Sequence, residues 1–320
     1  MHQPSIAVVI PAFNSATTIS GALDSALNQA EPPEEIIVVD DGSTDATKEV
    51  VRGFGSAVRL ITQPNQGAAV ARQTGTEAAT TDYIAYLDAD DWWPSDKLSL
   101  CRFILTREEI YFLLADLQRA RPGGLPVTYL PRNITFFPWA RQYLDEYRVS
   151  GNIADLYRLP SELGLFLLLR GFPVFPSTAL IKREVVLGVG GWDARFRRCQ
   201  DFDLGLRIAR RFPLHYLDQV QAILGLHEVN SDASAYVIKQ TQGDIRVLKA
   251  HFAAEPPESL YRQQVAQALA RKCCNLGYFY RKTGEMAQAR QAYRHALQWP
   301  SRRLHAFLRW ALLLLRAFDK

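Results

Sequence analysis

The sequence predicts a doubly wound α/β layer followed by an all-helical tail. Short apolar runs that suit buried strands alternate with segments of helical spacing through the first ninety residues. From about residue 233 onward the apolar spacing is helical. Alternating strands and helices favour a sheet with right-handed crossovers and helices on both faces. We therefore expect an α/β domain over residues 1–232 and a helical tail over residues 233–320.

The expected strands of the first ninety residues are short and apolar. The first is the run Ile6–Ile10, which we expect Pro11 to end, with Asn14 and Ser15 capping the next helix. Three more strands are expected at residues 34–40, 58–62 and 83–87, with helices between them. The second half has a weaker pattern, and strands are expected at residues 110–116, 177–181 and 216–226.

The residues at the carboxyl ends of three strands are candidates for a binding site. They are Pro11–Phe13, Asp40–Asp41 and Asp88–Asp90. In open α/β sheets, ligands bind in the crevice outside the carboxyl ends of the strands. The sequence therefore predicts a ligand site where these three strand ends converge.

The carboxylates at residues 88–91 predict a metal site. Strand residues alternate faces, so we expect Asp88 and Asp90 to project to the same side. Their mutual repulsion would be relieved by a cation, and hard carboxylate oxygens suit Mg²⁺ or Mn²⁺. The alternative is a solvated turn in which Asp91 caps the helix after Pro94.

Two common nucleotide-binding motifs are missing from the sequence. No G-x-G-x-x-G follows the first strand, and no G-x-x-x-x-G-K-S/T occurs. The dinucleotide-binding and P-loop classes are therefore excluded. A phosphate held without a glycine cradle or a lysine needs a cation, which the carboxylates of residues 88–91 can bind.

Four segments of the chain resemble the successive signatures of family 2 glycosyltransferases, which are inverting enzymes of the GT-A fold. The segments are VVIPAFNSATTISGALDSALNQ, EEIIVVDDGSTDAT, QPNQGAAVARQTG and YIAYLDADDWW. The resemblance covers roughly residues 5–230. It implies a GT-A-type mixed sheet, a nucleotide-diphospho-sugar donor and a divalent cation (Mn²⁺ or Mg²⁺). It also implies a nucleotide-sugar-binding half at residues 1–100 and an acceptor half at residues 101–232.

The resemblance assigns roles to residues of the first half. Arg72 matches the arginine of the family's A-R-N signature, here A-R-Q, and it could also be a surface helix residue. Asp41, together with Asp40, would face the base, and Asp88 and Asp90 would hold the ribose and the metal. The residues that this resemblance implies for nucleotide-sugar binding are Pro11, Ala12, Phe13, Asp40, Asp41, Arg72, Asp88 and Ala89.

A later segment, GGWDARFRRCQDFDLGLRI, resembles the family's acceptor-side E-D motif, whose aspartate is the general base. Here Gln200 replaces the glutamate, and Asp201 is the expected base at the start of a helix. The alternative is that Asp201 only caps that helix. Asp203 and Arg207, at i and i+4, are expected to form a surface pair.

His227 in LHEVNS matches a histidine that often follows the acceptor motif in this family. There it approaches the metal or the diphosphate, so we place it among the metal-binding candidates with Asp88 and Asp90. A structural role is the alternative. For the whole chain, the rival functions are a nucleotidyltransferase and a scaffold that binds nucleotide-sugars without catalysis.

The helical tail is basic and resembles a single tetratricopeptide repeat at residues 273–300. From Tyr261 onward the chain has twelve Lys and Arg residues and only two acidic residues, whereas the whole chain has a net charge of only +4. Such a tail indicates contact with an anionic surface such as phospholipid headgroups or nucleic acid, or it is a solvated helix face. The apolar segment 304–318, flanked by arginines, could pack on the repeat or lie in a membrane interface.

The composition suggests a protein of a reducing compartment. The four cysteines show no metal-binding or disulfide pattern, no leader sequence is evident and no apolar run spans eighteen residues. We expect a cytoplasmic protein without a membrane-spanning segment that contacts the inner face of the plasma membrane peripherally. Its expected partners are the sugar donor and a glycan or lipid-linked glycan acceptor, with no nucleic acid.

Overall fold

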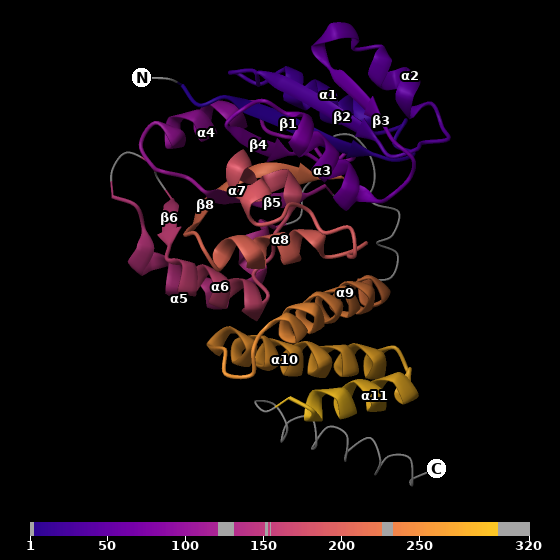
Figure 1. Ribbon diagram of the computed structural model, residues 1–320, viewed down its shortest axis with the longest axis vertical. Coiled ribbons are helices and arrows are strands. Elements are labelled where there is room, and N and C mark those ends of the chain that lie inside the picture. Colours follow the sequence, from indigo (N-terminus) through magenta and orange to yellow (C-terminus); the bar gives the residue numbers. More distant parts are fainter. Residues whose placement is uncertain (1–2, 121–130, 151–152, 154, 226–232, 300–320) are drawn as a thin grey trace. The chain divides into compact units, whose positions relative to one another are not determined.

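The computed structural model describes residues 3–120, 131–150, 153, 155–225 and 233–299 (Figure 1). The chain divides into two compact units, Met1–Leu226 and His227–Lys320, a boundary six residues before the one expected from the sequence. His227 and segment 304–318, which sequence analysis singled out, lie outside the described residues.

The first unit is an α/β domain whose elements alternate along the first hundred residues. These are β1 (Ile6–Ala12), α1 (Ile19–Leu27), β2 (Glu35–Asp40), α2 (Thr47–Arg52), β3 (Arg59–Thr62), α3 (Ala68–Ala78), β4 (Tyr83–Tyr86) and α4 (Lys97–Leu105). The second half contains β5 (Phe112–Arg119), α5 (Pro138–Leu144), β6 (Leu156–Leu159), α6 (Ser161–Arg170), β7 (Leu180–Lys182), α7 (Arg183–Gly188), α8 (Gln200–Ala209) and β8 (Leu214–Leu224).

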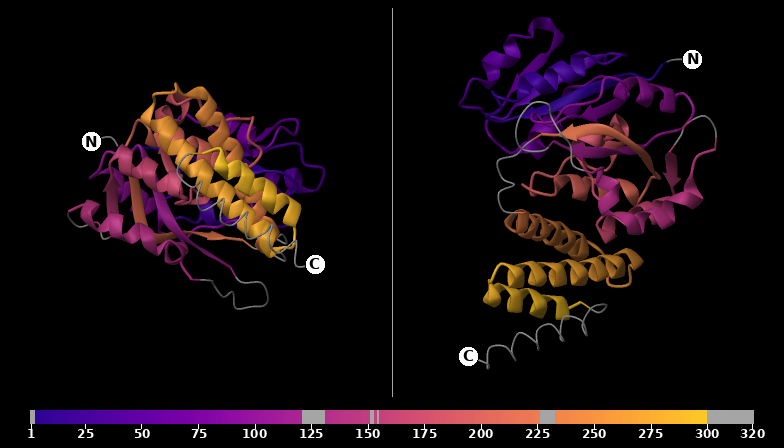
Figure 2. Two further views of the ribbon diagram at one scale, coloured as in Figure 1. Left: turned by 90° about the horizontal axis from the view of Figure 1, so that it is seen from below. Right: turned by 180° about the vertical axis from the view of Figure 1, so that it is seen from behind.

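Within the described residues, eight strands form one mixed sheet with the order β3-β2-β1-β4-β7-β5-β8-β6. Strands β1 to β4 are parallel, as the crossovers through α1, α2 and α3 require. Strand β7 is antiparallel to both β4 and β5, so it joins the two halves of the sheet. The expected mixed sheet with helices on both faces is confirmed (Figures 1 and 2).

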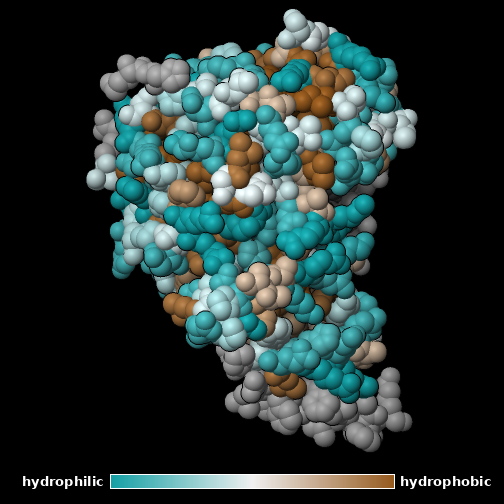
Figure 3. All heavy atoms as spheres, in the orientation of Figure 1, coloured by the Kyte–Doolittle hydropathy of each residue, from teal (hydrophilic) through white to brown (hydrophobic). Residues whose placement is uncertain are grey.

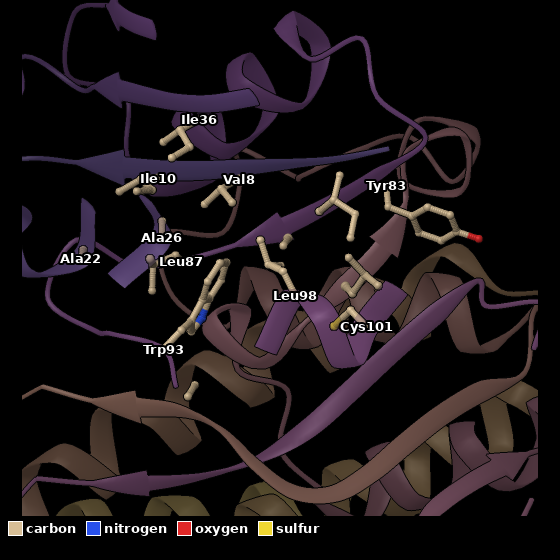
Figure 4. Close-up of a cluster of buried hydrophobic side chains, with 14 of the residues drawn as sticks. Val8, Ile10, Ala22, Ala26, Ile36, Tyr83, Leu87, Trp93, Leu98 and Cys101 are labelled. Atoms are coloured by element: carbon tan, nitrogen blue, oxygen red, sulfur yellow. The ribbon is translucent and has the colours of Figure 1, made fainter. Parts of the chain in front are cut away.

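Both faces of β1 are covered, which explains why its sequence is apolar at every position. Val8 and Ile10 belong to a core cluster that includes residues of α1 and α4, and Figure 4 shows these side chains together. Val9 points to the other face, where a Cβ on Gly75 of α3 would lie 2.4 Å from its side chain. Helix α3 can therefore approach the sheet only because it carries glycine at this position.

Two expectations about the first strand are wrong. Pro11 does not end the strand, because β1 continues to Ala12 and pairs there with β2. Beyond Val9 the strand has no further register partner in β4, so a residue without an N–H is tolerated. Asn14 and Ser15 do not cap α1, which begins after Thr18 without a side-chain cap.

The second unit contains helices α9 (Ala233–Ala254), α10 (Leu260–Lys282) and α11 (Met286–Leu297) in its described residues. Ser259 caps α10 by accepting a hydrogen bond from the Arg262 backbone N–H at 3.3 Å. Helices α10 and α11 approach closely at Gly277, where a Cβ would lie 2.6 Å from the Tyr293 ring. Both residues belong to the predicted tetratricopeptide pattern, which stays a prediction.

The described surface and helices give no sign of a spanning segment. No helix among the described residues is both long and apolar enough to cross a membrane. On the face seen in Figure 3, hydrophobic side chains form patches within a largely hydrophilic surface. All four cysteines fall within the described residues, and each is a buried thiol outside any disulfide.

Candidate active site

The loops after β1 and β2 hold each other through short polar side chains. Asn14, at φ 50°, donates its backbone N–H to Ser43 Oγ at 2.9 Å and accepts the Thr44 backbone N–H at 2.9 Å. The Asp40 carboxylate accepts the Ser43 N–H at 3.3 Å. Pro11 and Ala12 are buried at this edge, whereas Phe13 is 48% exposed. The strand ends expected to line the nucleotide are therefore adjacent.

Asp41 is buried and organises the loop between β3 and α3. One carboxylate oxygen accepts Gln63 Nε2 at 2.7 Å and the Gln66 backbone N–H at 2.9 Å. The other accepts the Gly67 N–H at 2.7 Å. Gly67 has φ 95°, a left-handed conformation that favours glycine, and helix α3 starts at the next residue. Asp41 thus ties the end of β2 to the start of α3.

Helix α3 carries Arg72 into the site, where the arginine pairs with Asp88. Arg72 Nη2 donates to Asp88 Oδ1 at 2.5 Å, and the arginine is 5% exposed. The interpretation of Arg72 as a surface residue is therefore wrong. Its Nε and Nη1 are buried and have no partner among the described residues. Buried polar groups are normally hydrogen-bonded, so this guanidinium is poised to bind an anionic ligand.

Asp88 to Asp91 form a turn that begins after β4 ends at Tyr86. The Asp91 N–H donates to the Asp88 carbonyl at 3.1 Å, so strand alternation does not set the directions of Asp88 and Asp90. Ser177 lies beneath the turn, where its Oγ accepts the Asp88 N–H at 3.1 Å and donates to Asp91 Oδ2 at 2.5 Å. Ala89 is buried and Asp90 is half-buried.

Asp91 is not the helix cap that one interpretation expected. It is 3% exposed, and its Oδ1 accepts the Gly225 N–H at 3.0 Å, while Asp96 stands at the N-cap of α4. Burial, together with the nearby charges of Asp88 and Asp90, raises the pKa of Asp91 to about 7. Three carboxyl groups therefore lie close enough to repel one another.

The end of β8 closes against this turn. Trp92 and Ile223 exchange two backbone hydrogen bonds, at 3.1 and 2.8 Å. A Cβ on Gly225 would lie 1.8 Å from the Asp90 carbonyl oxygen, so the two backbones touch. No local sequence pattern signals the roles of Ser177 and Gly225, because both residues act on a turn that is distant along the chain.

The acidic turn fits a divalent cation held partly by substrate. Asp91 has both oxygens engaged by the protein, which leaves Asp88 and Asp90 as candidate ligands. Among the described residues no group of three or more His, Cys, Asp or Glu side chains could hold a metal. Mg²⁺ commonly binds one or two carboxylates and completes its shell with water and substrate phosphates. Asp88 and Asp90 can bind such a cation, and the neighbouring Arg72 can bind the phosphates that complete its shell.

Asp201 lies in the first turn of α8 and is half-buried, and its Oδ1 accepts the Phe202 N–H at 2.8 Å. Asp203 and Arg207 do pair, but the expected surface location is wrong. Asp203 is 2% exposed and accepts Arg207 Nε at 3.0 Å and Nη2 at 2.6 Å. Asp203 is therefore a buried structural residue of α8.

The described contacts bring together Arg72, Asp88 and Asp91, with Asp90 in the same turn. They also join Asp40 and Asp41 to neighbouring loops at the carboxyl ends of the strands. This is the class of α/β domain that binds its ligand across the strand ends. Asp201 stands on a separate element, α8, and His227 lies outside the described residues.

Comparison with known proteins finds similarity to one family of enzymes. Residues 7–151 match the model of Glycosyl transferase family 2. A relative from Escherichia coli, UDP-Glc:alpha-D-GlcNAc-diphosphoundecaprenol beta-1,3-glucosyltransferase WfgD, is 31% identical over 42% of this chain and 55% of its own. Hyaluronan synthase of Pasteurella multocida is 40% identical over 31% of this chain and 10% of its own. The chain thus matches about half, or less, of the length of these relatives.

Solved structures share the fold over nearly the whole chain. TarS 1-349 of S. aureus in complex with UDP-GlcNAc has a TM-score of 0.63 at 16% identity, covering 93% of this chain and 82% of its own. Mannosyltransferase PcManGT of Pyrobaculum calidifontis, in complex with GDP-Man and Mn²⁺, has a TM-score of 0.59 at 18% identity, covering 98% and 81%. Over residues 7–151 the chain is similar to glycosyl transferase family 2, and its α/β domain has the GT-A fold.

Proposed function

We propose that the protein is an inverting glycosyltransferase that moves a sugar from a nucleotide-diphospho-sugar to an acceptor hydroxyl in bacterial cell-surface polysaccharide biosynthesis. One observation carries the proposal most directly. Arg72 is buried beside Asp88, and two of its nitrogen atoms have no partner in the part of the chain that the structure describes. Buried donors of this kind call for an anionic ligand, and the diphosphate of a sugar donor supplies one. The family match and the names of the relatives support the same reaction class.

The proposed donor site lies at the carboxyl ends of β1, β2 and β4. Pro11, Ala12 and the exposed ring of Phe13 would line the nucleotide. Asp40 and Asp41 would lie on the base side, with Asp41 fixing the 63–67 loop through three hydrogen bonds. Asp88 and Ala89 would contact the ribose side, and Arg72 the phosphates. Residues 1–100 would thus bind the donor, and residues 101–232 the acceptor.

Asp88 and Asp90 would hold a divalent cation, Mn²⁺ or Mg²⁺, together with His227. A cation bound there would neutralise the charge of the departing diphosphate. Repulsion among the carboxyl groups of this turn favours the same cation.

Asp201 is the proposed general base. The acceptor hydroxyl loses its proton to this carboxylate as its oxygen attacks the anomeric carbon opposite the leaving group. A single displacement inverts the configuration at that carbon and needs no protein nucleophile. The bond between the anomeric carbon and the phosphate oxygen breaks as the new glycosidic bond forms.

Calorimetric titration of UDP-, GDP- and dTDP-sugars, with and without Mn²⁺, tests the donor class. We expect one donor to bind the wild-type chain more tightly with Mn²⁺, and Asp90→Ala to lose that increase. Asp96→Ala removes an exposed carboxylate nearby on the same segment and should bind like the wild type. Absence of binding by every nucleotide-sugar would reject the proposed function.

A second variant tests the base. Asp201→Asn should bind the donor normally and release nucleoside diphosphate about 10²–10⁴-fold more slowly when a panel of sugar and lipid-linked sugar acceptors is supplied. Near-normal turnover by this variant would show that Asp201 is not the base.

The acceptor and the cellular location belong to the same proposal. A glycan or lipid-linked glycan acceptor fits a chain that acts at the inner face of the plasma membrane from the cytoplasm. The basic tail supports peripheral contact with anionic lipid, because each Lys or Arg near such a surface contributes about 1 kcal/mol. Truncation at Ser301 tests this contact by liposome co-sedimentation, and unchanged binding would remove segment 304–318 from it.

A further inference from the structure

The turn before α8 reaches the proposed donor site through Trp192. This residue is 6% exposed, and the centre of its ring lies 5.0 Å from the guanidinium carbon of Arg72. Its backbone N–H donates to Gln73 Oε1 at 2.9 Å, and its indole N–H donates to the Tyr86 hydroxyl at 3.0 Å. Trp192 is therefore held by side chains of both α3 and β4.

Hydrogen bonds continue from Tyr86 back to Arg72. Thr76 Oγ1 donates to the Arg72 carbonyl at 2.7 Å and lies 2.7 Å from the Tyr86 hydroxyl. Because the single proton of Thr76 points to Arg72, the Tyr86 hydroxyl is the donor in that second contact. The chain of donors thus runs from Trp192 through Tyr86 and Thr76 to the backbone of Arg72.

Gly191 allows this close approach. It has φ 68°, and a Cβ there would lie 2.2 Å from Gln73 Oε1. Any larger residue would displace Gln73, which accepts the Trp192 N–H. Gly191 therefore allows Trp192 to lie against α3.

Helix α8 holds the other side of the same turn. Arg207 donates from Nη1 to the Val189 carbonyl and from Nη2 to the Gly191 carbonyl, both at 2.7 Å. The buried Asp203 fixes this arginine with two hydrogen bonds. A continuous set of contacts therefore connects Asp88, Arg72, Trp192 and the helix that carries Asp201.

We propose that Trp192 is a positioning residue for Arg72. Its ring lies over the guanidinium while Nη2 binds Asp88, so that Nε and Nη1 stay available for the phosphates of the donor. This role rests on the proposed function, since it assumes a nucleoside diphosphate ligand. The Val189–Trp192 turn connects α8, which carries the proposed base Asp201, to Arg72, which would bind the donor.

A double-mutant cycle tests whether Trp192 acts through Arg72. The variants are Trp192→Leu, Arg72→Ala and the double variant, and the probes are UDP and GDP, each titrated with Mn²⁺. Trp192→Leu should weaken binding of the preferred diphosphate about tenfold, the size expected for a largely desolvated cation–π contact. In the Arg72→Ala background the same substitution should change the affinity less than about twofold, because its effect requires the arginine.

Two further variants control for loss of structure. Trp139→Leu removes another tryptophan that lies under an arginine, Arg170, at 5.2 Å, and should leave diphosphate binding unchanged. Trp192→Phe keeps an aromatic ring over Arg72 and loses only the indole N–H, so it should bind more tightly than Trp192→Leu. It also serves if the leucine variant fails to fold.

The outcomes separate the two proposals. If the wild-type chain binds neither diphosphate, the proposed function fails. If it binds and Trp192→Leu weakens binding equally with and without Arg72, the positioning role is overturned while the function stands. Equal losses for the Phe and Leu variants would also overturn it, because the ring would then contribute nothing.

Discussion

Replacing Gly225 by alanine tests how the acidic turn is held. The new Cβ would lie 1.8 Å from the Asp90 carbonyl oxygen, whereas real Cβ atoms essentially never come within 3.0 Å of such an atom. The two backbones must therefore separate by at least 1.2 Å. Neither atom belongs to a flexible side chain, so the shift has to break backbone contacts.

Those contacts set the size of the effect. The hydrogen bond from the Gly225 N–H to Asp91 and the paired bonds between Trp92 and Ile223 lie within three residues of the clash. Overpacking costs about 1–3 kcal/mol, and a buried carboxyl group that loses its donor costs about 1–3 kcal/mol more. We expect the melting temperature of the α/β domain to fall by about 5–10 °C. Binding of Mn²⁺ with nucleoside diphosphate should weaken at least about tenfold, because Asp90 moves.

Differential scanning calorimetry and calorimetric titration measure both effects. Gly21→Ala is the matched control, since it lies inside α1 with nothing within 4 Å of the new Cβ. It should stabilise the protein by about 0.5–1 kcal/mol and leave binding unchanged. A Gly225→Ala chain that melts and binds like the wild type would refute the contact between Gly225 and Asp90.

Three other predictions concern stability. His215 is fully buried without a partner for either ring nitrogen among the described residues, and burial lowers its pKa to about 4. The unfolded chain binds the proton first, so stability should fall as pH drops from about 6.5 to about 4, by about 2 kcal/mol at pH 5. Urea unfolding at pH 7.5 and pH 5 should show this loss in the wild type and less of it in His215→Leu; identical slopes with pH would contradict the assignment. Burial lowers the pKa of Lys97 to about 8, and its Nζ lies 4.9 Å from the Trp93 ring centre. Lys97→Met should therefore add about 1–2 kcal/mol at pH 7 and remove the rise in wild-type stability between about pH 8 and pH 10.5; a less stable variant would count against this reasoning. Gly277→Ala should lower hydrogen-exchange protection in α10 and α11 by about 1–3 kcal/mol, because the new Cβ meets the Tyr293 ring, while Gly188→Ala, with open space around it, should not. Unchanged protection would show that this helix pair has room for the methyl group.

The sequence predicted the sheet because burial on both faces leaves a visible pattern. The apolar run of β1 packs α1 and α4 on one side and α3 on the other, and alternation is lost when both faces are covered. The carboxyl ends of β1, β2 and β4 were predicted for the same reason, since the strands end where polar residues begin. The limits of the expected strands differed by only a few residues, but the edge strand β6 (Leu156–Leu159) was not expected.

The details of the site depended on distant partners and were not predictable. Asp91 looked like a helix cap, but Ser177 and Gly225 hold it in the interior. Asp203 and Arg207 have the spacing of a surface pair, yet Arg207 serves the carbonyls of Val189 and Gly191. The spacing of two residues along a helix shows that their side chains can pair. It does not show which distant group they also bind.

The three hydrogen bonds at Asp41 bear on engineering this protein. The Asp41 carboxylate holds the segment Gln63–Gly67 in place through these bonds. Asp41 and the segment therefore depend on each other, and replacing one of them alone would disturb the other. A grafted segment that lacks Gln63, or whose backbone follows another path at residues 66–67, would leave the buried Asp41 carboxylate short of hydrogen-bond donors. Attempts to alter the proposed nucleobase site should therefore change Asp41 and the 63–67 loop together.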